Sequence, residues 1–176
     1  MTLPAPGLVS LFAGASGFSR MDLAPLRRVP AALALLLSAA CGGMNSQTHA
    51  FATLIEARQS GAIATGRMPE GLPPSSHDIR EAHVPGTSQR WGIINFPQSE
   101  AHVLRALLQA EQIPLDGHEC DIPARIEWWP IELRGVLNGT RIAATGTQGY
   151  RARNGELIFA VNWRQGRAYY WAAPSR

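Results

Sequence analysis

The sequence of 176 residues lacks an apolar run long enough to cross a membrane as a helix. A spanning helix needs about 20 apolar residues, whereas the run at 29–40 has twelve positions and includes Pro30. Lysine is absent, so all 16 basic residues are arginine, and with the many Ala, Gly and Pro residues this indicates a GC-rich genome. Internal repeats are also missing, so we do not expect a repeat architecture.

The sequence also lacks several catalytic signatures. It contains no Gly-x-Ser-x-Gly elbow, no His-Glu-x-x-His motif and no phosphate-binding glycine loop. It has two cysteines, Cys41 and Cys120, and no second Cys or paired His stands at a metal-site spacing, so we expect neither a metal nor a cofactor. These absences favour a non-enzymatic protein, although a catalytic triad is recognised by geometry rather than by sequence order.

An export signal is present at residues 21–41. Arg27 and Arg28 supply a positive n-region, residues 29–37 supply an apolar h-region, and Ser38-Ala39-Ala40 supplies a small-residue cleavage site. Residues 1–20 precede it without a basic n-region of their own, which indicates either a start assigned too early or an unusually long signal. We therefore expect residues 1–40 to be a signal peptide and exclude them from the prediction of the fold.

The segment Leu37-Ser38-Ala39-Ala40-Cys41 resembles the signal of bacterial lipoproteins, in which the cysteine after the cut is acylated. That family usually has Leu three residues before the cysteine, where this chain has Ser38, and the same segment also suits ordinary signal peptidase. The resemblance implies lipidation of Cys41 by acyl chains such as palmitate. Because Gly42 rather than Asp follows, it further implies a periplasmic protein anchored to the outer membrane of a Gram-negative bacterium. Residues 41–176 carry no resemblance to a family.

Removing the signal changes the charge of the protein. The whole chain has a net charge of +3, whereas residues 41–176 hold 13 Arg and 12 acidic residues, a net charge of +1. A nucleic acid partner is not expected, because such proteins normally carry a basic footprint. Residues 41–140 hold 7 Arg and 11 acidic residues, whereas residues 141–176 hold 6 Arg and one acidic residue. This asymmetry indicates a solvated arginine-rich sheet face, or a surface that steers an anionic partner.

The mature chain is predicted to be a tether at 41–48 followed by one α+β domain at 49–176. Apolar residues at positions 50, 51, 54 and 55 predict a first helix that ends by Gly61. Apolar residues at 103, 104, 107 and 108 predict a second helix, capped by Ser99 and ended by Pro114. Between the two helices, residues 79–84 and 89–96 predict an antiparallel hairpin.

The last third of the chain is predicted to be a three-stranded meander. Its strands are expected at 142–153, 156–163 and 167–171, with Asn154-Gly155 in a two-residue type I′ turn. Residues 125–134 predict a further strand, in which Trp128 and Trp129 face opposite ways. The fold class is therefore α+β, with a small antiparallel sheet of hairpin plus meander packed on one side by about two helices.

An acidic loop at 114–123 concentrates groups that could carry chemistry. It contains His118 and Cys120, and His77 lies before the predicted hairpin. A Cys near a His can act as a nucleophile, so these three residues are the candidate catalytic groups, and buried inert cysteine is the alternative. If Cys41 is acylated, Cys120 is a lone thiol; if it is not, a disulfide between the two remains open.

The aromatic residues suggest a binding surface. Large flat rings with a polar handle are favoured at interfaces, and arginines near them add polar contacts. The candidate binding residues are Trp128, Trp129, Tyr169, Tyr170, Arg164 and Arg167.

Taken with the signal, these patterns favour a small envelope lipoprotein that binds another envelope protein or a cell-wall glycan without catalysis. Three alternatives stay open. One is an immunity-type inhibitor of a periplasmic toxin, and another is a hydrolase using His118 or His77 with Cys120 or a serine. The third is a structural or assembly role in which the final sheet edge pairs with another chain.

Overall fold

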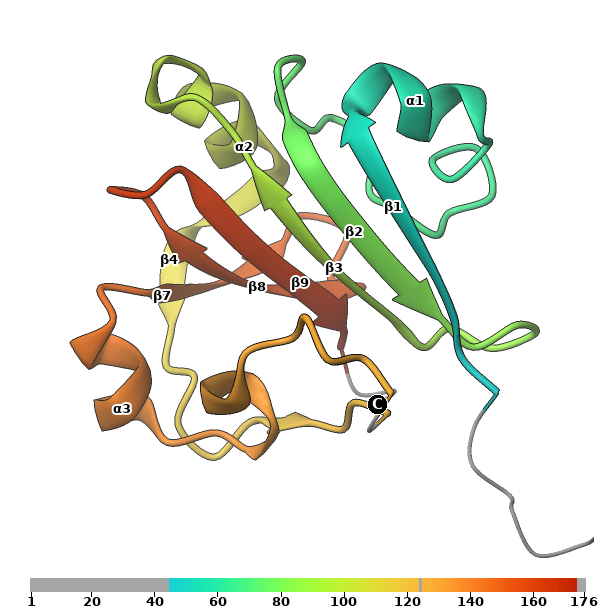
Figure 1. Ribbon diagram of the computed structural model, residues 1–176. Helices are drawn as coiled ribbons and strands as arrows, with labels where there is room; N and C mark the ends of the chain where they lie inside the picture. The colour runs from blue at the N-terminus through green and yellow to red at the C-terminus, as the bar shows by residue number, and fades with distance from the viewer. Residues whose placement is uncertain (1–44, 124, 174–176) are drawn as a thin grey trace, which may run out of the picture. The chain divides into compact units, whose positions relative to one another are not determined.

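The structure is a computed structural model that describes residues 45–123 and 125–173. It contains a seven-stranded antiparallel sheet and a two-stranded sheet (Figure 1). In spatial order, the seven strands are β1 (Gln47–Thr53), β2 (His77–His83), β3 (Arg90–Asn95), β9 (Arg167–Ala172), β8 (Leu157–Asn162), β7 (Gln148–Ala152) and β4 (Leu108–Ile113). The two short strands are β5 (Glu119–Cys120) and β6 (Gly135–Val136). The predicted signal and Cys41 lie outside the described residues.

The predicted α+β class is confirmed, and the predicted hairpin and meander form two parts of the large sheet. Strands β2 and β3 are the hairpin, and β7, β8 and β9 are the meander. They join because β3 pairs with β9, so that Trp91 faces Trp171 and Asn95 faces Arg167. The sheet is larger than predicted because β1 extends it at one edge and β4 at the other.

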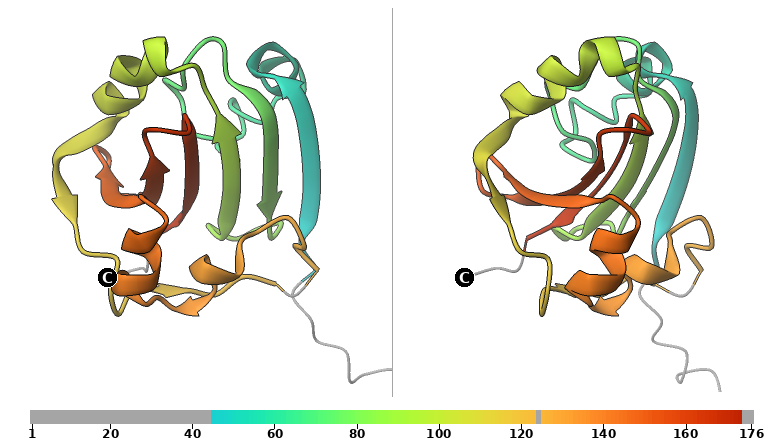
Figure 2. Two further views of the ribbon diagram at one scale, coloured as in Figure 1. Left: turned by 60° about the vertical axis from the view of Figure 1, so that its left-hand side comes forward. Right: turned by 90° about the vertical axis from the view of Figure 1, so that its left-hand side faces the viewer.

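Both faces of the sheet are covered, whereas the sequence predicted helices on one side. Alternation along β8 sends Leu157, Phe159 and Val161 into a first core and Ile158 and Ala160 into a second core. The first core is covered by α1 (Leu54–Gln59), the loop at 60–76 and α2 (Ala101–Leu107), and the second by the segment at 114–147, which holds α3 (Gly139–Ala144). Figure 2 shows α2 and α3 at opposite ends of the sheet.

The first predicted helix is wrong over its first half. Strand β1 begins at Gln47, inside the expected tether, and α1 begins only at Leu54. The apolar pairs four residues apart fit a helix, but Phe51 is buried by pairing with Ile79 of β2, and the side chain of Ile55 is 62% exposed. Thr53 marks the switch, because its hydroxyl accepts a hydrogen bond from the backbone N–H of Glu56 and caps α1.

The second predicted helix is shorter than expected. Helix α2 ends at Leu107, and strand β4 occupies 108–113 before Pro114. Leu108 is buried as predicted, but it reaches the first core from a strand. No side chain caps α2 or the 3₁₀ turn at Gln98–Glu100 that precedes it, so the predicted capping role of Ser99 is wrong.

Two predicted strand segments adopt other structures. Residues 125–134 form turns and a 3₁₀ helix at Ile131–Leu133, and Ile142 lies in α3, whose first turn is capped by Asn138. The turn between β7 and β8 is not type I′, because that turn needs positive φ at both central residues. Gly155 has φ +76°, but Asp78 is the one non-glycine residue with positive φ in the part of the chain described. Within that part, no helix is both long and apolar enough to span a membrane.

Candidate functional site

An open groove lies against strands β1, β2, β3 and β9, on the face of the sheet that carries the second core. Its volume is about 590 Å³. The polar and aromatic residues that line it are Asp78, Arg80, Asn95, Trp128, Arg167 and Tyr169. We call it the Trp128 groove.

Strand register brings the groove residues together from distant parts of the sequence. Ala50 faces Arg80, Arg80 faces Ile93, and Ile93 faces Tyr169, so one row of side chains crosses four strands on one face. The next row pairs Asn95 with Arg167. The covering segment at 114–147 packs mainly against the other half of this face, and the small side chain of Ala50 leaves the floor of the groove open.

The groove carries more positive than negative charge. Its lining contributes two guanidinium groups, from Arg80 and Arg167, and one carboxylate, from Asp78. Asn95 orients Arg167, because its Oδ1 accepts a 2.8 Å hydrogen bond from the Arg167 Nε. Arg80 is exposed, and its side chain makes no hydrogen bond or ion pair to any other described residue. The groove therefore has one positioned guanidinium and one that is available to a ligand.

Trp128 is held at the groove by its buried neighbour. Trp129 is 2% exposed, and its Nε1 donates a 2.7 Å hydrogen bond to the carbonyl of Leu133. Its ring packs edge-on against Tyr169 and Trp171, with centroids 5.6 and 6.2 Å away. Trp128 packs edge-on against Trp129 at 5.9 Å and stays half-buried. The anchored Trp129 ring thus holds Trp128 at the groove.

The structure places three of the six predicted binding residues at the groove, namely Trp128, Tyr169 and Arg167. Tyr170 lies in the first core and Trp129 in the second. Arg164 lies exposed in the β8–β9 turn, where its carbonyl accepts a hydrogen bond from Gln98.

Sequence reasoning missed Asp78, Arg80 and Asn95 as binding residues. Arg80 and Asn95 belong to the predicted hairpin and Asp78 comes just before it, and nothing in the sequence indicates that this hairpin pairs with the meander.

The three candidate catalytic residues, His118, Cys120 and His77, do not interact through polar contacts within the described residues. No hydrogen bond or ion pair in the described part of the chain links His118 or His77 to Cys120, and the His77 Nδ1 lies 3.2 Å from the carbonyl of Ser75. Cys120 is a free thiol, 1% exposed, within the second core. Burial, with a smaller effect of Asp121, raises its pKa to about 12, so the thiol stays protonated near neutral pH. Its surroundings fit a buried inert cysteine.

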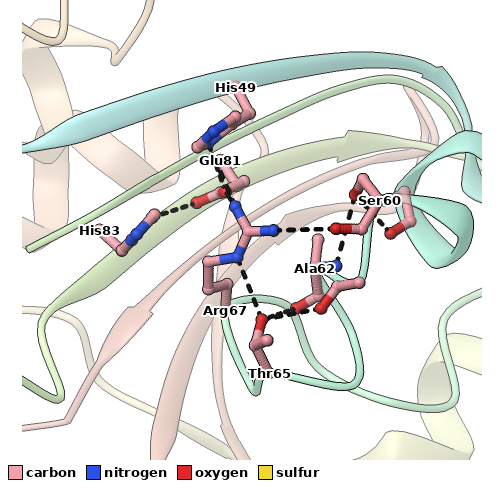
Figure 3. A network of polar contacts seen from close by, with 9 residues as sticks. His49, Ser60, Ala62, Thr65, Arg67, Glu81 and His83 are labelled. Carbon is pink, nitrogen blue, oxygen red and sulfur yellow. Dashed lines mark hydrogen bonds and ion pairs between the residues drawn. The ribbon is translucent and has the colours of Figure 1, made fainter. Parts of the chain in front are cut away.

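An ionic network centred on the buried Glu81, with His49 exposed at its edge, lies on the opposite face of the sheet at β1 and β2 (Figure 3). Glu81 has no exposed surface, and its Oε1 accepts a 2.7 Å hydrogen bond from the Arg67 guanidinium. His49 Nδ1 lies 2.8 Å from the same oxygen, and His83 Nδ1 lies 3.1 Å from Oε2. Arg67 also donates hydrogen bonds to the Thr65 hydroxyl and to the carbonyl of Ser60. We call these residues the Glu81 network.

The sequence holds only a weak signal for this network. Glu81 and His83 are two residues apart on a predicted strand and so share a face, but His49 fell in the region predicted as a tether and helix. Comparison of the chain with protein-family models, with curated proteins and with solved structures gave no match. The geometry of the Trp128 groove and the Glu81 network is therefore what bears on function.

Proposed function

We propose that this protein is a non-enzymatic binding protein of the bacterial envelope, and that the Trp128 groove binds a cell-wall glycan that bears carboxylate groups. The signal at residues 21–41 and acylation of Cys41 would deliver it to the periplasmic side of the outer membrane. The observation that carries the proposal is the convergence of two half-exposed aromatic rings and two guanidinium groups on one open groove.

Each part of the groove matches a part of such a ligand. The faces of Trp128 and Tyr169 offer flat apolar surface with a polar edge, which suits the apolar face of a sugar ring. A guanidinium group presents a planar set of donors that matches a carboxylate, and Arg80 has no partner within the described residues. Asp78 and Asn95 add an acceptor and an amide for ligand hydroxyl groups.

Two features support binding rather than turnover. The groove lining contains one carboxylate and neither Cys nor His, so it offers no evident nucleophile with an adjacent base. The candidate thiol, Cys120, is sealed in the second core.

The proposal is tested by titrating the full chain with soluble muropeptides by isothermal calorimetry. Removing a hydrogen bond to a charged group costs about 1.5–3 kcal/mol, so Arg80→Gln should weaken binding about 10- to 100-fold. Trp128→Leu should also weaken it. Arg164→Gln is the matched control, because Arg164 is exposed outside the groove, and it should bind like the parent chain.

Ligand chemistry gives a second arm of the experiment. Muropeptides with amidated carboxylates should bind as weakly to the parent chain as the native ligand binds to Arg80→Gln. Cleavage of the ligand by the parent chain, or equal binding by the parent chain and both groove variants, would contradict the proposal.

A further inference from the structure

Three side chains of the Glu81 network have the chemistry of metal ligands. His49 lies on β1 directly opposite Glu81 on β2, and His83 follows Glu81 by two residues, so all three project from one face. One donor atom from each residue lies within 4.8 Å of the other two. Imidazole nitrogen and carboxylate oxygen are common ligands of Zn²⁺ and related divalent ions.

The spacing of the donor atoms is close to that of a coordination shell. Ligands about 2.0–2.2 Å from a metal lie roughly 3 Å from each other. His49 Nδ1 lies 2.8 Å from Glu81 Oε1, and His83 Nδ1 lies 3.1 Å from the other carboxylate oxygen, Oε2. Glu81 is fully buried and held from several sides, and the His49 and His83 rings stack with centroids 5.8 Å apart at an interplanar angle of 11°. Both imidazoles therefore already contact the carboxylate before any ion arrives.

We propose that His49, Glu81 and His83 bind a divalent transition-metal ion such as Zn²⁺. In the structure each Nδ1 faces a carboxylate oxygen, an arrangement in which the neutral imidazole carries its proton on Nδ1. Metal binding requires that proton to move to Nε2, which leaves each imidazole neutral and frees the Nδ1 lone pair. Three protein ligands leave at least one coordination position for water.

A buried donor without a partner lies on this same face of the sheet. The hydroxyl of Tyr170 is fully buried and has no hydrogen-bond partner among the described residues. The Tyr170 ring crosses Gly92, and Gly92 is the register partner of Glu81, so the hydroxyl is directed from β9 toward the strand that carries Glu81. A water on the metal would supply a partner to this buried donor.

Arg67 competes with the metal for Glu81. Its guanidinium lies 2.7 Å from Glu81 Oε1 and 3.3 Å from His49 Nδ1, in the region that a cation would enter. The guanidinium is itself a cation, so it repels a metal ion there. Its hydrogen bonds to Thr65 and Ser60 give it other partners when it moves away from Glu81. Arg67 thus balances the buried carboxylate in the metal-free protein and lowers the affinity for metal.

The test is a calorimetric titration of the metal-free full chain with Zn²⁺. We expect one ion per chain. Loss of a partner that only orients a ligand costs about 10- to 100-fold in affinity, so removal of a ligand itself, in His49→Gln or His83→Gln, should cost more than about 100-fold. His77→Gln is the matched control, because His77 is an exposed histidine on the same strand as His83, and its Zn²⁺ affinity should equal that of the parent chain.

Arg67→Gln should change the Zn²⁺ affinity in the opposite direction, and this separates the proposed site from adventitious binding by histidines. Removing the competing guanidinium should raise the Zn²⁺ affinity about tenfold or more, while thermal unfolding by circular dichroism checks that each variant folds. If a variant does not fold, the visible absorption of Co²⁺ bound to the parent chain reports the nitrogen and oxygen ligands directly. Absence of saturable binding by the parent chain, or equal binding by the His49→Gln/His83→Gln double variant, would overturn the proposal.

Discussion

Replacing Gly92 with Ala should destabilise the protein because the Tyr170 ring occupies the space of the new methyl group. A Cβ built on Gly92 would lie 2.2 Å from Tyr170 Cζ and 2.3 Å from its Cε1 and hydroxyl oxygen. Tyr170 cannot move aside easily, since it is 0% exposed and packs against Phe159 with ring centroids 5.7 Å apart. The backbone of Gly92 is ordinary strand, so the effect comes from packing and not from φ.

The expected change in the free energy of unfolding is the balance of two opposing effects. Overpacking of a well-filled core costs about 1–3 kcal/mol, and three contacts this short place the variant near the upper value. Replacing Gly by Ala at a compatible backbone position stabilises a protein by about 0.4–1 kcal/mol through the unfolded state. We therefore expect a net loss of about 2 kcal/mol in the free energy of unfolding, measured by urea denaturation with an unchanged m-value.

A double-mutant cycle isolates the clash. Leu at position 170 lacks the ring atoms that meet the new methyl group, so Gly92→Ala in a Tyr170→Leu background should become neutral or slightly stabilising. Tyr170→Phe removes the hydroxyl but keeps Cζ and Cε1, so most of the loss should persist there. Equal losses in all three backgrounds would refute the packing argument.

Three further predictions concern ionisable groups. Glu81→Gln removes the charge partner of Arg67 and should cost about 3 kcal/mol in urea unfolding, as for other broken buried pairs; a loss below about 1 kcal/mol would contradict this. Burial raises the pKa of Cys120 from 9.0 to about 12, so its contribution to stability is full below pH 9 and is lost as the pH rises toward 12. Cys120→Ala should therefore lose less stability than the parent chain across that interval in alkaline unfolding curves. Hydrogen bonds from the Ser75 hydroxyl and N–H lower the pKa of Glu100 below its ordinary 4.5, so its contribution is present above that pH and lost as the pH falls through the lower value. Glu100→Gln should destabilise the protein at pH 7 but not in strong acid, as measured by thermal unfolding.

The parts of the fold that could be predicted are those with a clear local pattern. The strands predicted at 79–84, 89–96, 156–163 and 167–171 correspond closely to β2, β3, β8 and β9. The prediction failed where one spacing fits two structures. Leu104 and Leu108 are four residues apart and both buried, yet the chain changes from helix to strand between them because β4 pairs with β7.

The candidate sites depended on pairing that is distant in the sequence. Trp128, Tyr169 and Arg167 were predicted to bind because aromatic and arginine residues cluster near them. Arg80 reaches the same groove only through the pairing of β3 with β9, and no local pattern encodes that pairing. The Glu81 network was hidden for a similar reason, since His49 comes from an edge strand whose sequence resembles a helix.

The strand order also sets when the sheet can be completed. Among the described strands β9 comes last in the sequence, and it lies between β3 and β8. Until residues 167–172 arrive, β1-β2-β3 and β8-β7-β4 are separate half-sheets, each with an unpaired inner edge. Pairing between segments so far apart in sequence is slow compared with local folding. The two half-sheets therefore cannot join into one sheet until β9 is available, however early their own strands pair.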